Sequence, residues 1–173
     1  MRRNLLIAII VIIALIIGLI WLSHVRDGTR QVHATFARLQ QEVEGGDASG
    51  VVGELAPDYD YTGLWPGYFD NAEIKTALGD GNPDAKNRDV AKHGLAILFF
   101  THRERPYHFA YTVKNISFAP DGTATVDCIL EVGDGTTMVV DPQVPHTFVL
   151  VPSGIFATMR IRSHDKFTAA IGM

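Results

Sequence analysis

Disulfide bonds within this chain are impossible, because Cys128 is its single cysteine and a bridge needs two. An excess of positive charge is also missing, since 15 Lys and Arg stand against 19 Asp and Glu for a formal net charge of −4. A mildly acidic chain lacks the clustered basic residues that neutralise phosphates, which excludes nucleic acid as an expected partner. Stability must therefore come from the packing of a hydrophobic core.

Sequence motifs for metal or phosphate chemistry are absent as well. The seven histidines form no H-E-x-x-H pattern, and there are no paired cysteines that could hold zinc. Gly79-x-Gly81 lacks the third glycine of a nucleotide-binding loop and follows no predicted strand. We therefore expect no metal and no cofactor.

Residues 5–22 are an unbroken apolar run without a charge. As a helix rising about 1.5 Å per residue, the run would be roughly 27 Å long, close to the hydrocarbon thickness of a bilayer. It predicts a single membrane-spanning anchor. A cleaved signal peptide is the alternative, but such peptides have apolar cores of about 7 to 15 residues and a small-residue cleavage site. The segment Trp21-Leu22-Ser23-His24 offers no such site.

The charges on either side of the run indicate its orientation. Arg2 and Arg3 precede it, while Arg26 and Arg30 follow it. The very short N-terminal flank favours keeping its arginines in the cytoplasm and translocating the rest of the chain. We expect a single-pass protein of the cytoplasmic membrane with an extracytoplasmic C-terminal domain. Its expected parts are a cytoplasmic tail (1–4), the anchor (5–22), a juxtamembrane linker (23–29) and one domain (30–173).

The sequence of the domain predicts helices first and antiparallel strands afterwards. Val32, Phe36, Leu39 and Val43 share one helical face, and Asp47 is placed to cap a short second helix. Pro120-Asp121-Gly122 is a strong hairpin turn. This order predicts an α+β domain whose curved antiparallel sheet wraps around helices, like a cone. The further expected elements are helices over 71–78 and 84–101 and strands over 59–65, 107–118, 123–132, 136–140, 146–151 and 156–162.

The chain resembles the nuclear-transport-factor-2-like (SnoaL-like, cystatin-like) superfamily over most of residues 30–165. The resemblance is carried by these segments: Glu44-Gly45-Gly46-Asp47-Ala48, Leu55 to Gly63, Val113 to Phe118 into Asp121 to Val126, and Thr147 to Val151 turning through Gly154 into Met159 to His164. Relatives often carry a Gly-x-Trp-x-Ile pattern in that last strand, where this chain has Phe156 or Met159. These motifs are fold signatures and carry no catalysis. The resemblance implies a pocket between the sheet and the helices, and it allows a homodimer through the sheet.

Two sets of residues are candidates for the site. Tyr59, Tyr61, Trp65 and Tyr68 are expected to line the mouth of a pocket for a small apolar ligand, since Tyr and Trp bury apolar area while keeping one polar atom available. Asp127 is the acidic residue best placed for the pocket, and with Tyr61 or Tyr111 it could form a carboxylate and hydroxyl pair for proton transfer. The competing interpretation is that Asp127 alternates with an apolar face as any solvent-facing residue would. Cys128 points with that apolar face and is expected to be an inert core residue.

Three functions remain open from the sequence. The leading hypothesis is a membrane-anchored, extracytoplasmic binding or interaction module without catalysis. The second is a small isomerase, cyclase or dehydratase that uses Asp127 or Asp60 beside a tyrosine. The third is a scaffold subunit of an inner-membrane assembly, because the layout of tail, span and outer domain is similar to scaffold subunits of type IV secretion systems.

Overall fold

The computed structural model describes residues 10–19, 27–59, 88–136, 138–140, 145–154 and 158–165. Residues 10–19 form a helix whose apolar side chains are exposed, with Ile10 at 59% and Leu19 at 65%. Among the described residues, no helix is both long enough and apolar enough to cross a membrane. Residues 5–9 and 20–22 of the expected anchor lie outside the described part of the chain, as do the predicted helix over 71–78 and the predicted strand over 59–65 beyond Tyr59.

Two capped helices follow. Helix α2 (Gly28–Glu44) begins within the expected linker, where the Asp27 carboxylate accepts a hydrogen bond from the Arg30 amide at 3.2 Å. Its predicted apolar face is confirmed, because Val32, Phe36 and Leu39 are buried. Helix α3 (Ala48–Gly53) is capped as predicted by Asp47, whose side chain accepts from the amides of the first turn.

The remaining described elements are one helix and a five-stranded antiparallel sheet in the order β1-β2-β4-β5, with β3 paired to β2. The hairpin turn predicted at 120–122 is confirmed, and Gly122 adopts φ 84°, which favours glycine. The fold is α+β, as the sequence predicts. The bounds are α5 (Arg88–Thr101), β1 (His108–Phe118), β2 (Ala124–Gly133), β3 (Met138–Val140), β4 (Pro145–Ser153) and β5 (Thr158–His164).

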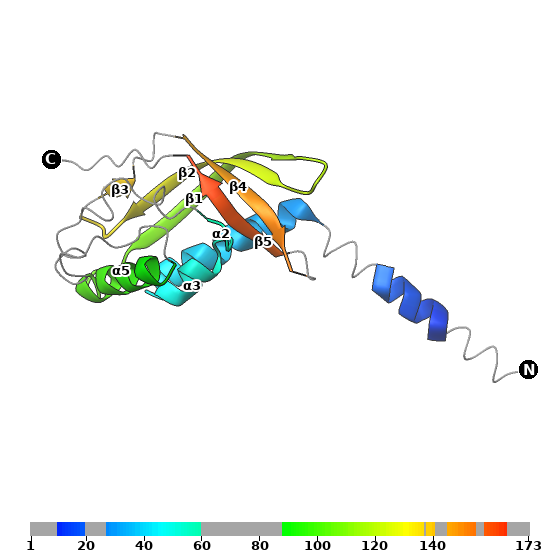
Figure 1. The fold of residues 1–173 in the computed structure, drawn as a ribbon, viewed down its shortest axis with the longest axis horizontal. Coiled ribbons are helices and arrows are strands. Elements are labelled where there is room, and N and C mark those ends of the chain that lie inside the picture. The colour runs from blue at the N-terminus through cyan, green and yellow to red at the C-terminus, as the bar shows by residue number, and fades with distance from the viewer. Residues whose placement is uncertain are drawn as a thin grey trace, which may run out of the picture.

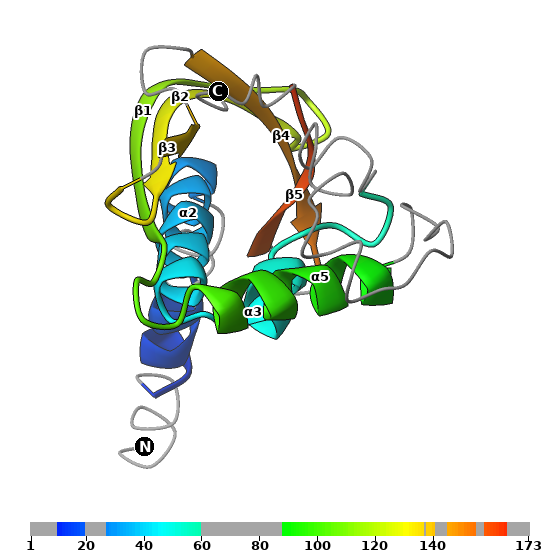
Figure 2. The same cartoon turned by 90° about the vertical axis from the view of Figure 1, so that its left-hand side faces the viewer.

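The sheet curves around α2, while α3 and α5 lie together at one side (Figures 1 and 2). Phe36 of α2 is fully buried against the surface of the sheet that faces this helix, stacked on Tyr111 of β1 and edge-on to Phe148 of β4. On β2 the alternation places Val126, Cys128 and Leu130 inward, with the intervening residues turned away from the helices. We call the surface that faces α2 the inner face of the sheet.

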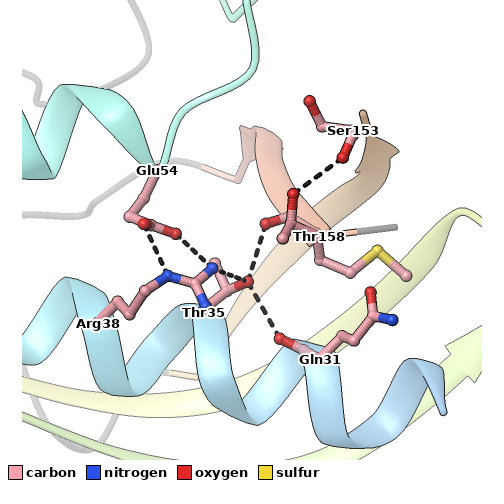
Figure 3. Close-up of polar contacts among 7 residues, drawn as sticks. Gln31, Thr35, Arg38, Glu54, Ser153 and Thr158 are labelled. Atoms are coloured by element: carbon pink, nitrogen blue, oxygen red, sulfur yellow. Dashed lines mark hydrogen bonds and ion pairs between the residues drawn. The ribbon is translucent and has the colours of Figure 1, made fainter. Parts of the chain in front are cut away.

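A partly buried polar network joins α2 to the end of α3 and to β5 (Figure 3). Arg38 donates to both carboxylate oxygens of Glu54, each at 2.8 Å, and also to the Thr35 hydroxyl at 3.2 Å. The Thr35 hydroxyl in turn donates to the Met159 carbonyl at 2.9 Å. Bidentate pairing of this kind fixes geometry as well as contributing energy. The network holds α2 in register with the end of α3 and with β5.

Replacing Arg38 with Met should lower the free energy of unfolding by about 2 kcal/mol. The substitution leaves Glu54, whose side chain is only 15% exposed, without its cationic partner, and a poorly solvated carboxylate is costly to leave unpaired. Urea unfolding of the full chain in a mild detergent measures the change. Arg162→Met is the matched control, because its pair with Asp58 has both side chains more than half exposed (53% and 54%) and should contribute less than about 1 kcal/mol. Equal losses in the two variants would contradict the prediction.

Candidate functional site

The inner face of β4 begins with a buried histidine. His146, Phe148 and Leu150 alternate inward along the strand, as the twofold period of a strand requires. Thr35 and His146 are both buried although their side chains are polar. Thr35 belongs to the network between α2 and β5, whereas His146 lies near a second histidine, His164.

A β-bulge turns His164 to the inner face. Met159 and Ile161 are buried on the inner face. Uninterrupted alternation along β5 would therefore place Ser163 on the inner face and His164 on the outer face. The pairing of β4 with β5 shifts, however, because Leu150 pairs with Ile161 while Val149 pairs with Ser163, leaving Arg162 as the extra residue. His164 therefore lies opposite Phe148, and the two rings stack with centroids 5.6 Å apart.

Tyr59 reaches the same place from the segment after α3. Leu55 forms a parallel bridge with Ile161, and the Ala56 amide donates to the Ile161 carbonyl at 2.8 Å. The segment therefore runs in the direction of β5 toward His164. The Tyr59 side chain is buried, and its hydroxyl shares a hydrogen bond of 2.6 Å with His164 Nδ1. We call Tyr59, His146 and His164 the inner-face cluster.

Burial lowers the pKa of His164 to about 4, from an ordinary value of 6.5. Loss of solvation is the main cause, the nearby His146 adds to it, and Asp165 opposes it. At neutral pH the imidazole of His164 is therefore uncharged. A neutral imidazole has one nitrogen that donates and one that accepts, so with the Tyr59 hydroxyl it provides both kinds of hydrogen-bonding group.

Cys128 pairs with His146 across β2 and β4 and is fully buried. Burial raises the pKa of its thiol to about 12, with smaller contributions from Asp127 and Asp165. The thiolate is the reactive form of cysteine, so the thiol is unreactive at neutral pH. This agrees with the sequence prediction of a core cysteine.

Asp127 and Tyr111 are not brought together. Asp127 alternates with the buried residues of β2 and so lies on the outer face, where its carboxylate accepts a hydrogen bond from the Thr147 hydroxyl at 2.8 Å. Tyr111 lies on the inner face against Phe36, and its hydroxyl donates to the His33 carbonyl at 3.4 Å. The carboxylate and tyrosine pair considered from the sequence is therefore absent between these two residues, because opposite faces of one sheet separate them.

Of the other sequence candidates, Tyr59 lies in the inner-face cluster, while Asp60, Tyr61, Trp65 and Tyr68 lie outside the described residues. The two histidines were missed. His146 is spaced by two residues from Phe148 and by four from Leu150, and this strand spacing could have predicted that it shares their face of the sheet. No pattern in the sequence marks the bulge that turns His164 inward. In the part of the chain that the structure describes, no three or more His, Cys, Asp or Glu residues are grouped as metal ligands.

Comparison with known proteins shows the fold. No family model matches the chain, and no curated protein matches its sequence. Aln2 from a Streptomyces species matches with a TM-score of 0.54 at 14% identity, over 79% of this chain and 87% of that one. A domain of unknown function with a cystatin-like fold from Nostoc punctiforme matches with a TM-score of 0.53 at 12% identity, over 81% and 76%.

A ketosteroid isomerase-like protein from Erwinia carotovora atroseptica is more distant, with a TM-score of 0.43 at 17% identity, over 80% of this chain and 94% of that one. At such identities a likeness shows the fold alone, and function must be argued from the site. The chain has an α+β fold of the cystatin-like kind.

Proposed function

We propose that this chain is a membrane-anchored, extracytoplasmic binding module that holds a small, largely apolar molecule without transforming it. The observation that carries the proposal is the hydrogen bond of 2.6 Å between the Tyr59 hydroxyl and His164 Nδ1, set beside the buried His146 on an apolar inner face. Ligand sites are mostly apolar with a few convergent polar groups that fix orientation.

The chemistry of the inner-face cluster favours an uncharged ligand. His164 is neutral at pH 7 because burial lowers its pKa to about 4. A phenol hydroxyl and a neutral imidazole can hydrogen-bond a carbonyl or hydroxyl group, while the surrounding apolar side chains contact a hydrocarbon body. Tyr61, Trp65 and Tyr68 are the residues that we propose complete the lining.

The anchor in this proposal is the apolar run 5–22, with Arg2 and Arg3 in the cytoplasm. Washing membranes of the native host with alkaline carbonate tests it, because a spanning helix stays in the membrane and a peripheral protein is released. Protease added outside spheroplasts should then digest the domain. A soluble form lacking its first residues would instead support the cleaved signal peptide.

Catalysis of an isomerase or dehydratase type is the second candidate. Its support is that Tyr59 and His164 lie within hydrogen-bond distance in a buried setting, which is the arrangement that general acid–base chemistry needs. A pKa of about 4 makes His164 a weak base at neutral pH. Binding is therefore the better supported of the two.

Native mass spectrometry of the full chain, purified in mild detergent from its own host, tests the binding function. We expect the wild type to carry one small molecule, and we expect Tyr59→Phe and His146→Phe to lose most of it, because each removes a polar group of the cluster. Tyr111→Phe is the matched control and should retain the molecule, since the Tyr111 hydroxyl contacts the His33 carbonyl instead. An empty wild type, or equal retention by all variants, would contradict the proposal. A bound molecule that changes mass during incubation would support the enzyme.

A further inference from the structure

An open groove of about 390 Å³ lies at the N-terminal end of α2. Its lining is mostly apolar and includes Phe118, Pro152 and Met159, with Asp27, Thr29 and Gln31 as its polar members. The tip of the β1–β2 hairpin lies at the same end of the domain as the start of α2 (Figure 1). None of Tyr59, His146 and His164 lines the groove, so it is distinct from the inner-face cluster.

The Phe118 ring lies close to the backbone of Gly28 at this groove. A Cβ atom added to Gly28 would lie 2.6 Å from Cε1 of the Phe118 ring, so only glycine lets the ring lie on the first turn of α2. The ring nevertheless remains 44% exposed. The ring extends the apolar lining of the groove, and contiguous exposed apolar surface marks sites of protein or membrane interaction.

We propose that this groove lies against the lipid bilayer and contacts its acyl-chain region through Phe118. The inference rests on the proposed anchor and adds a second membrane contact to it. With the anchor ending at Leu22, the five links to Asp27 span at most about 17 Å. Because Asp27 itself borders the groove, the groove cannot lie far from the membrane surface.

The charges around the groove indicate which part of the lipid it contacts. Asp27 lines the groove, while Arg30 on α2 and Asp121, next to the lining residue Gly122, are exposed near it. This mixture is unlike the basic clusters that bind anionic headgroups. Aromatic and aliphatic side chains of surface-bound segments instead enter the boundary between headgroups and acyl chains. The contact therefore forms on neutral phosphatidylcholine and needs no anionic lipid.

Fluorescence quenching of the full chain in phosphatidylcholine nanodiscs tests the contact. A nitrobenzoxadiazole label on Ala119→Cys reports from the hairpin tip, and one on Glu104→Cys reports from the exposed segment after α5. Cys128 stays unlabelled because it is buried and its thiol pKa is raised to about 12. With doxyl-labelled phosphatidylcholine, position 119 should lose most of its emission while position 104 keeps it.

A pair of phenylalanine variants assigns the contact to the groove. Phe118→Ser should restore emission at position 119, whereas Phe100→Ser, which alters a phenylalanine 68% exposed on α5, should leave the quenching unchanged. Equal quenching at positions 119 and 104, or quenching that requires anionic lipid, would overturn the inference while leaving the anchor intact. A chain that fails to enter nanodiscs at all would overturn the anchor, and the inference with it.

Discussion

Phe36→Ala is expected to lower the free energy of unfolding by about 3–5 kcal/mol, as large-to-small aromatic substitutions in cores do. Phe36 is fully buried, and its ring lies 5.2 Å from the ring of Tyr111 and 5.2 Å from that of Phe148. These partners come from β1 and β4, so the cavity would open where the helix meets the centre of the curved sheet. Urea unfolding of the full chain in mild detergent measures the loss.

Phe36→Leu is the control for this substitution. It keeps most of the apolar volume and should cost about 1 kcal/mol, because it removes the ring contacts but leaves a smaller void. Since whole domains are stable by only about 5–15 kcal/mol, the alanine variant should also show a weakened near-ultraviolet circular dichroism signal from its tyrosines. A loss below about 1 kcal/mol for Phe36→Ala would mean that α2 does not pack inside the sheet.

Acidification should destabilise the domain through His164. The pKa of its imidazole is about 4 in the folded chain and 6.5 at its ordinary value. Between these two pH values the unfolded chain binds a proton that the folded chain does not, so stability falls as the pH is lowered. At about 1.4 kcal/mol per pH unit, the loss between pH 7 and pH 4 is about 3 kcal/mol. Urea unfolding at a series of pH values measures the slope.

His164→Phe should remove most of this slope. The variant keeps a ring against Phe148 but has no titrating group at this position. The change in its free energy of unfolding between pH 7 and pH 4 should therefore come only from the other titratable groups of the protein. Replacing His93, which is exposed on α5, with Gln should retain the wild-type slope. A slope that persists in His164→Phe would show that another group causes the loss, and the neutral imidazole in the proposed site would lose its support.

Much of this fold could be predicted from local patterns. The apolar spacing of Val32, Phe36 and Leu39 predicted the buried face of α2, and Asp47 predicted the start of α3, because capping and helical periodicity depend on neighbouring residues. The alternation of β2 likewise predicted that Cys128 points inward. That same alternation already placed Asp127 on the opposite face, where its carboxylate accepts a hydrogen bond from Thr147.

The site depends on contacts between segments that are distant in the sequence. Tyr59 and His164 meet because Leu55 bridges Ile161, and His164 faces inward because Arg162 is an extra residue in the pairing of β4 with β5. A bulge arises from how two strands fit together, so neither strand's own sequence specifies it. The sequence by itself determined the α+β class, the helix faces and the alternation of the strands. Only the tertiary structure decided which polar side chains lie together, because one shifted residue reverses the face on which a side chain lies.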